Sequence, residues 1–381
     1  MSLKQKSRRD WRRLDLNYKT LTEFSVGGGS YGISASAVNK SDELPTYLRI
    51  TDIYDDGTID FEGLMSVDDG KSGKYILEPN DIVFARTGGS TGRNYFYDGT
   101  DGEFVYAGFL IKFSIDPEKC NPKFIKYYCQ SQDYKDWVQS FNTGSTRGNI
   151  NAKTYGGMPI PDLSREQQDL IVNTLSSFDE RIVENKKINH HLEQMAMAIF
   201  DDMFPDVSSG DSTIGKYIVP KRGKGLLSKD AVDGVVPVIA GGLQPATYHN
   251  VANTVAPVIT ISASGANAGY VNLWSVPVWS SDSSFIDKSM TNDVYFWYIM
   301  LKKRQQEIYD SQTGSAQPHI YPKHIDIMPT IALTDESIAS FTEKVSPMFE
   351  QIGNNLDEIK VLQDTRDALL PKLLSGELSL D

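Results

Sequence analysis

The chain has 381 residues, of which 40% are hydrophobic, and a formal net charge of −12. This length is sufficient for two domains that each bury a core of their own. No run of about 18 apolar residues occurs, which excludes a transmembrane helix, and two cysteines without metal-ligand neighbours indicate reduced thiols in a cytoplasmic protein. Residues 162–205 and 331–381 hold 9 and 10 acidic residues, against 4 basic residues in each segment. The rest of the chain is nearly neutral, so the net charge does not exclude a nucleic-acid partner.

The first glycine-rich stretch is FSVGGGSYG at 24–32, which contains a formal GxGxxG pattern. A dinucleotide-binding turn needs a helix directly after it and an acidic residue about 20 positions further on. The residues that follow, SASAVNKSDELP, are typical of turns, so we interpret this stretch as a loop. Residues 47–63 and 80–97 are predicted to form β-strands broken by Asp-Gly and Gly-Gly turns.

One stretch of the sequence occurs twice. Residues 143–159 read TGSTRGNINAKTYGGMP, and residues 313–329 read TGSAQPHIYPKHIDIMP, with seven identities and no gap. The offset of 170 residues persists through the segments that follow, so we predict two copies of one structural unit. In the earlier part of each copy the offset changes, because Gly92 aligns with Gly269 at a distance of 177 residues.

Each copy ends in a predicted helix of about 40 residues, roughly 60 Å long. Ser164 and Thr334 are the expected N-caps, and Pro205 is expected to end the first helix. Alternating steps of four and three residues place mostly apolar side chains on one seam, which predicts a two-helix coiled coil. The seam residues of this prediction are Phe178, Ile182, Asn185, Leu192, Ile199, Met348, Ile352, Asn355, Leu362 and Leu369. At this stage Asn185 and Asn355 fit equally well as buried register-setting residues or as polar positions in solvent.

The sequence contains no recognisable catalytic constellation. Residues 87–93, TGGSTGR, lack the Gly-Lys-Ser/Thr ending of a phosphate loop, and no AdoMet-binding or Asn-Pro-Pro-aromatic motif is present. The five histidines form no metal-ligand cluster. We therefore predict no catalytic residue, no metal site and no cofactor.

Binding to DNA is better supported, because glycine-rich loops carry Arg, Asn, Ser and Tyr side chains. Arg reads guanine, Asn and Gln read adenine, and small loop residues donate to phosphates. The candidates in the first copy are Arg86, Ser90, Arg93, Asn94, Tyr95, Arg147 and Asn149. Those in the second copy are Lys221, Arg222, Lys224, Ser262, Ser264, Asn267, Tyr270, Gln317 and His319. Each of them taken singly is also typical of an ordinary turn or surface residue.

Several of these stretches together resemble the specificity (S) subunits of type I restriction–modification enzymes. They are YGISASAV, LPTYLRITDIYDDGTI, DIVFARTGGSTGR and MPIPDLSREQQDLIV in the first copy, and PVIAGGLQPATYHN, ITISASGANAGYVNLW and ALLPKLLSGEL in the second. The second copy departs from the pattern at MPTIALTDESI, before its helix.

The resemblance implies an α+β chain with two tandem mixed α/β target-recognition domains, each followed by a long helix. The two helices would pair as an antiparallel coiled coil with pseudo-twofold symmetry. The expected boundaries are 1–162 and 206–332 for the recognition domains, and 163–205 and 333–381 for the helical spacers. The implied partners are double-stranded DNA with a bipartite target, two methyltransferase (M) subunits, and restriction (R) subunits through the complex.

Two other classes of function remain open from the residues alone. One is a self-contained DNA methyltransferase or nuclease, and the other is a coiled-coil scaffold with two ligand-binding lobes and no role in DNA recognition. If the coiled coil sets the spacing between half-sites, removal of seven residues from each helix shortens it by about 10 Å. We therefore expect a DNA spacer that is shorter by about 2–3 base pairs.

Overall fold

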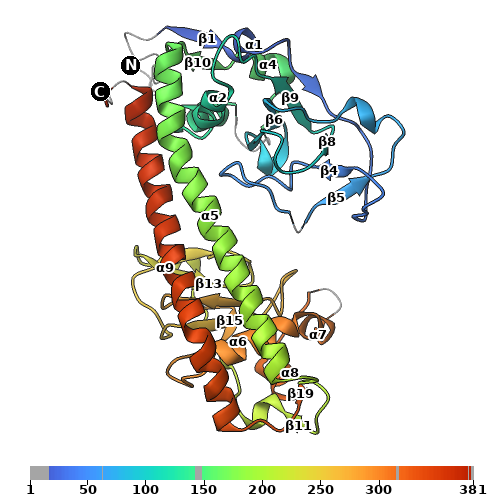
Figure 1. The fold of residues 1–381 in the computed structure, drawn as a ribbon, viewed down its shortest axis with the longest axis vertical. Coiled ribbons are helices and arrows are strands. Elements are labelled where there is room, and N and C mark those ends of the chain that lie inside the picture. The colour runs from blue at the N-terminus through green and yellow to red at the C-terminus, as the bar shows by residue number, and fades with distance from the viewer. Residues whose placement is uncertain (1–16, 62, 142–147, 315–316, 376, 379–381) are drawn as a thin grey trace. The chain divides into compact units, whose positions relative to one another are not determined.

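The computed structural model describes residues 17–381 except 62, 142–147, 315–316, 376 and 379–381. The chain divides into two compact units, and each unit contains part of both long helices (Figure 1). Unit 1 comprises residues 1–181 and 361–381, and unit 2 comprises residues 182–360. Within the described part of the chain, no helix is both long and apolar enough to cross a membrane.

Unit 1 is built around two four-stranded sheets. The first has the order β2-β9-β6-β7, and its strands are Ser30–Tyr31, Leu110–Ser114, Asp81–Ala85 and Asn94–Tyr97. The second has the order β3-β5-β4-β8, and its strands are Ala37–Val38, Met65–Val67, Thr46–Leu48 and Phe104–Tyr106. A short antiparallel pair joins β1 (Tyr18–Thr20) to β10 (Pro159–Pro161). The helices that precede α5 are α1 (Leu21–Phe24), α2 (Pro122–Tyr128), α3 (Gln132–Gln139) and α4 (Ala152–Gly156).

Unit 2 repeats this arrangement, with three strands instead of four in its second sheet. Its first sheet has the order β12-β18-β15-β16, and its strands are Lys221–Arg222, Ser283–Asp287, Val258–Ser262 and Val271–Trp274. Its second has the order β14-β13-β17, and its strands are Thr247–His249, Val236–Ile239 and Trp279–Ser280. The pair β11–β19 (Ser212–Thr213 and Pro329–Thr330) corresponds to β1–β10. The shorter helices of this unit are α6 (Val294–Lys303), α7 (Gln305–Asp310) and α8 (Pro322–Asp326).

The two long helices are α5, Arg165–Met203 with 39 residues, and α9, Asp335–Leu374 with 40 residues. Both predicted caps are confirmed: the Ser164 hydroxyl accepts from the backbone N–H of Gln167, and the Thr334 hydroxyl accepts from that of Ser337. In both cases the side chain at the third helical position also accepts from the cap N–H. The helices therefore begin where short polar side chains satisfy their first free donors.

Each unit packs its sheet against both long helices. In unit 1, Phe84 of β6 stacks on Tyr155 of α4 with ring centroids 4.7 Å apart, and the same core contains Leu175 of α5 and Leu370 of α9. In unit 2, the core contains a cluster of four packed rings, namely Phe200 of α5, Phe204 directly after α5, Phe296 of α6 and Phe341 of α9. Neither helix could bury its apolar side without the other helix and the sheet.

The helices run antiparallel, as the pairings inside unit 2 show. Asn185 lies opposite Glu358, Asn189 lies opposite Asn355, and later residues of α5 lie opposite earlier residues of α9. Asn185 and Asn355 are 0% and 3% exposed, and the other seam residues are buried or half-buried. The amide of Asn185 donates to Glu358 over 2.9 Å and that of Asn355 to Asn189 over 2.7 Å. The mixed α+β fold with two tandem modules and paired helices is thus confirmed.

A charged network in unit 1 links its sheet-side helix α2 to both long helices. Asp179 of α5 accepts from Lys126 at 3.0 Å, from the hydroxyl of Tyr127 at 2.9 Å and from Arg366 of α9 at 2.8 Å. Burial alone would raise the pKa of Asp179, but the neighbouring Lys126 and Arg366 outweigh it, so the pKa lies below its ordinary value.

Candidate nucleic-acid interface

The two units present the same β-hairpin loop. The loop joins β6 to β7 in unit 1 and β15 to β16 in unit 2, and it spans residues 86–93 and 263–270. Gly92 donates to the carbonyl of Ala85 at 3.0 Å, and Gly269 donates to that of Ser262 at 2.7 Å. Both glycines have positive φ, +92° and +90°, which only glycine adopts without strain. The 177-residue offset predicted from the sequence therefore relates the two loops bond for bond.

The repeated stretch that follows each module packs against this loop. Ile150 donates its backbone N–H to Arg86 O at 2.9 Å, and Ile320 donates to Ala263 O at 3.0 Å. Asn149 and His319, which precede these isoleucines, form isolated bridges to the loops. Within the repeat, the described residues 148–159 and 317–329 thus hold the hairpin loop in place from one side.

A third segment approaches the loop at a glycine that follows β2 or β12. A Cβ atom added at Gly32 would lie 2.2 Å from the carbonyl oxygen of Tyr106, and one at Gly223 would lie 2.5 Å from that of Ser280. The backbone can run this close to the neighbouring strand only without a side chain. The last glycine of the GxGxxG pattern therefore serves close backbone packing.

Four segments meet at each loop. The side chains that these segments present at the loop are called the tip of that unit. The unit 1 tip consists of Tyr31, Arg86, Phe109 and Asn149, and the unit 2 tip consists of Arg222, Ser264, Asp282 and His319. Arg86 N–H donates to Phe109 O at 3.0 Å, and Ala263 N–H donates to Asp282 O at 3.1 Å, so the turns before β9 and β18 occupy the same place.

The unit 1 tip combines one cation with exposed aromatic rings. The guanidinium of Arg86 lies 5.0 Å from the ring centroid of Tyr31, at cation–π distance. Its Nη2 is 3.5 Å from Oδ1 of Asn149, a long and weak hydrogen bond. Phe109 is 59% exposed and Tyr31 is 42% exposed. Exposed aromatic and Arg side chains on one surface are typical of an interface.

The unit 2 tip has different chemistry on the same backbone. Arg222 contacts the carboxylate of Asp282 at 2.5 Å, and the hydroxyl of Ser264 donates to that carboxylate as well. Burial would raise the pKa of Asp282, but Ser264, Arg222 and the nearby His319 lower it below its ordinary value. The two tips therefore offer different hydrogen-bonding groups to a partner.

Three candidates of unit 1 are engaged within the protein. Asn94 is 7% exposed and donates to Cys129 O at 3.2 Å, and Tyr95 is 4% exposed and donates to Asp101 at 2.8 Å. Arg93 pairs with Asp55 at 2.8 Å. All four residues of β7 are buried because the sheet is covered on both faces. We therefore leave Asn94 and Tyr95 out of the proposed DNA-contacting surface.

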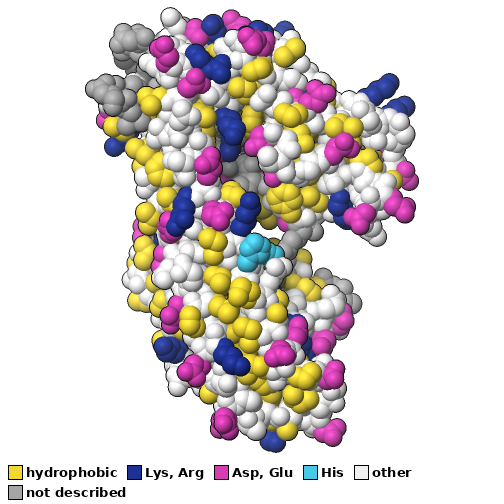
Figure 2. All heavy atoms as spheres, in the orientation of Figure 1, with side chains coloured by type: hydrophobic (Ala, Val, Ile, Leu, Met, Phe, Trp, Pro, Cys, Tyr) yellow, Lys and Arg dark blue, Asp and Glu magenta, His cyan; other side chains and the backbone are white. Residues whose placement is uncertain are grey.

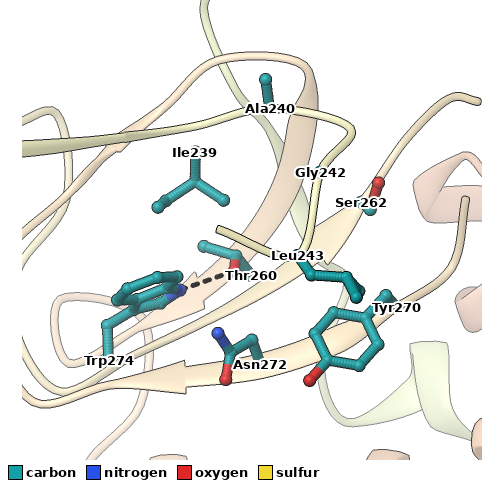
Figure 3. A pocket seen from close by; sticks show the side chains of 9 residues that line it. All are labelled: Ile239, Ala240, Gly242, Leu243, Thr260, Ser262, Tyr270, Asn272 and Trp274. Carbon is teal, nitrogen blue, oxygen red and sulfur yellow. Dashed lines mark hydrogen bonds between the residues drawn. The ribbon is translucent and has the colours of Figure 1, made fainter. Parts of the chain in front are cut away.

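In unit 2 the corresponding face of the hairpin is less deeply buried and lines a small pocket (Figure 3). Tyr270 of the loop and Asn272 and Trp274 of β16 line it, and the indole of Trp274 donates to Thr260 at 2.8 Å. Ser262 also lines the pocket, and its hydroxyl has no hydrogen-bond partner among the described residues. Asn267 donates weakly to Gly241 O at 3.5 Å.

The remaining candidates are placed as follows. Lys221, Lys224 and Gln317 are exposed, and Ser90 is half-buried. Arg147 lies outside the described residues. Among the described residues, no group of three or more His, Cys, Asp or Glu could hold a metal ion.

Sequence reasoning missed Tyr31, Phe109 and Asp282. Tyr31 belongs to the stretch interpreted as a loop, which instead contributes β2 to the sheet. Phe109 and Asp282 lie in turns before β9 and β18 that carry no turn motif beyond a single glycine or serine. A signal was available: the antiparallel pairing of β2 with β9 and of β12 with β18 makes these segments neighbours of the loops.

The charged side chains form no single large basic face on the side of the molecule seen in Figure 2. There, Lys and Arg are interspersed with Asp and Glu across the residues that the structure describes. A nucleic acid would therefore be bound through local groups, such as the tips, rather than through an extended field of one sign.

Taken together, the fold and the tips define a tandem-module binding protein, with two copies of one loop frame that carry different side chains and are joined by paired helices. Comparison with known proteins identifies the family. The model of the "Type I restriction modification DNA specificity domain" matches residues 45–194, which include the unit 1 loop and most of α5. Residues 45–194 thus carry a type I DNA specificity domain, and over 68% of its length the chain is similar to type I specificity subunits.

Relatives support this assignment over most of their length. The specificity subunit of the type I restriction enzyme MjaIX from Methanocaldococcus jannaschii is 24% identical, and the match covers 68% of this chain and 69% of the relative. A type I specificity subunit of Mycoplasma genitalium is 26% identical over 68% of this chain and 72% of its own length. The crystal structure of a type I restriction–modification S subunit from M. genitalium has the same fold, with a TM-score of 0.52, 20% identity and coverage of 95% and 98% of the two chains.

Proposed function

We propose that this chain is the DNA-recognition subunit of a type I restriction–modification complex and reads a bipartite sequence. Each tip would contact one half-site. The observation that supports this proposal most strongly is the repeated loop frame. The same backbone hydrogen bonds recur in both units, whereas the side chains change from Arg86 and Phe109 in unit 1 to Ala263 and Asp282 at the equivalent positions of unit 2. Different side chains on one frame are expected where two modules read different base sequences.

The second part of the proposal concerns the long helices. We infer that α5 and α9 dock two methyltransferase subunits and set the distance between the half-sites. Several large apolar side chains on these helices are exposed, and they are Val183, Met195, Leu356 and Val361. Exposed apolar residues on a strongly acidic helix pair suit a protein partner and disfavour DNA. Methyl transfer and DNA cleavage would then belong to the partner subunits, with no catalytic role for this chain.

Co-expression with a cognate type I methyltransferase subunit, followed by mapping of methylated bases, tests this function. The expected result is methylation at one bipartite sequence that depends on both subunits. Methylation or cleavage by the purified chain alone would instead indicate a self-contained enzyme. A chain that binds no DNA, alone or in the complex, would indicate a coiled-coil scaffold.

A further inference from the structure

We propose that Arg86 reads a guanine in one of the two half-sites and thereby sets the sequence preference of unit 1. This inference rests on the proposed function and goes beyond it, because it assigns one base contact to one side chain. Arg86 is placed for this role by its lack of an acidic partner, by its support from Tyr31 and by its position at the unit 1 tip.

Arg86 has no carboxylate partner among the described residues. Most other described arginines lie within 4 Å of one, and these are Arg49, Arg93, Arg165, Arg222, Arg304 and Arg366. A carboxylate occupies the two donors that an arginine would present to a base. At the unit 2 tip, Asp282 accepts from Nη2 of Arg222, and the residue equivalent to Arg86 is Ala263. The two tips therefore differ in whether they offer a free guanidinium.

The guanidinium of Arg86 is also held in place before any DNA is bound. Its contact with the Tyr31 ring at 5.0 Å restrains the plane of the group. Tyr31 is itself fixed, because its hydroxyl accepts from the N–H of Ala152 at 3.1 Å. The Nε atom of Arg86 is buried and has no hydrogen-bond partner among the described residues, so the outer Nη groups are the edge that faces a partner. A side chain that is already ordered loses less entropy on binding.

The outer edge of a guanidinium matches one base edge in the major groove. Guanine presents O6 and N7 side by side as acceptors, and two parallel N–H donors of Arg bind both. Adenine offers a donor at one of these positions, which an Arg without acceptors cannot satisfy. The weak 3.5 Å contact with Asn149 is the only hydrogen bond that the Arg86 side chain makes to a described residue, so it is exchanged at little cost.

The experiment compares the mapped methylation motifs of complexes that contain the wild-type chain, Arg86→Ala or Arg86→Lys. Arg86→Lys keeps the charge but loses the planar pair of donors. Both variants are expected to reduce discrimination at one G·C position by about 5- to 150-fold, with the other half-site unchanged. The second half-site serves as the internal control for folding and assembly. If Arg86 contacted only phosphate, Arg86→Lys would retain the wild-type motif.

A modified base provides a second and independent readout. Replacement of that guanine by 7-deazaguanine removes the N7 acceptor, and it is expected to weaken binding of the wild-type complex but not that of the Arg86→Ala complex. Unchanged motifs in both variants, or an equal effect of 7-deazaguanine on both complexes, would overturn the assignment to Arg86. A wild-type complex without any sequence-specific methylation would overturn the proposed function, and this inference with it.

Discussion

Removal of one heptad from each long helix tests whether the helices set the spacing between the half-sites. We choose residues 183–189 of α5 and 355–361 of α9. This double deletion removes both sides of the asparagine cluster at once, including Asn185, Asn189 and Asn355. At the point where the chain is rejoined in each helix, the two flanking seam residues are three positions apart. The intact seam alternates steps of three and four residues, so this spacing keeps the seam continuous.

The magnitude follows from helix geometry. Seven residues at 1.5 Å each shorten the pair by about 10 Å, and at 3.4 Å per base pair this corresponds to a spacer shorter by about 2–3 base pairs. Removal of seven residues changes the rotation about the protein helix axis by only about 20°. In DNA with about 10 base pairs per turn, removal of 3 base pairs changes the rotation about the DNA axis by roughly 100°. We therefore expect the shortened protein to prefer a shorter spacer but to bind it less tightly than the wild-type protein binds its own target.

The assay is the mapping of methylated bases in cells that express the variant together with the methyltransferase subunit. Both half-site sequences are expected to persist, with a shorter interval between them. As a control, deletion of 183–189 alone moves the two helices out of register and is expected to abolish methylation. A double-deletion protein that folds and methylates at the wild-type spacing would refute the idea that the helices set the spacing.

The structure makes three further predictions about stability. Gly32→Ala is expected to lower the free energy of unfolding by about 1–3 kcal/mol in a denaturant titration, because the new Cβ would overlap a carbonyl oxygen. The control is Gly28→Ala, which has open space around it and is expected to change the free energy of unfolding by less than about 0.5 kcal/mol. Equal effects of the two substitutions would contradict this reasoning. Asp179→Asn is expected to cost about 1–3 kcal/mol at neutral pH. Because the folded-state pKa of Asp179 is depressed, this difference persists above about pH 4 and disappears as the pH falls through the folded-state pKa; a pH-independent difference in urea unfolding would contradict the ion-pair assignment. Asn185→Leu is expected to raise the thermal midpoint of unfolding by about 2–4 °C, because the Asn185 Oδ1 is buried without a partner among the described residues. Asn355→Leu breaks two hydrogen bonds and is expected to lower the midpoint. A decrease with Asn185→Leu would show that the single hydrogen bond from Asn185 to α9 outweighs the cost of burying its unpaired oxygen.

The sequence was sufficient to predict the architecture because the long helices and the repeat are periodic over many residues. A 39-residue helix repeats its seam often enough to be recognised, and its Ser164 cap and its end before Pro205 follow from backbone chemistry. The offset of 177 residues between Gly92 and Gly269 also held, because both positions need the left-handed conformation that glycine supplies.

The tips could not be predicted to the same extent, because their residues come from four short segments. Strand β2 has only two residues, too few to show an alternating pattern. Strand β7 is buried on both faces, so Asn94 and Tyr95 could not be distinguished from surface residues by alternation either. The arrangement that places Phe109 beside Arg86 depends on sheet order, which a single sequence does not encode locally.

The loop frame separates stability from recognition in both units. The hydrogen bonds that recur in the two loops join backbone groups, and the residues that must be small, Gly92 and Gly269, lie beneath the loop surface. The side chains at the exposed end take no part in those bonds, so Arg86 in one unit can correspond to Ala263 in the other without a change in backbone geometry. A substitution at a tip therefore alters the groups offered to a partner at little cost in folding, whereas a substitution in the frame affects folding first. This separation predicts that exchange of the tip side chains between the units transfers half-site preference, whereas Gly92→Ala, at a positive φ, lowers stability without changing the sequence that is read.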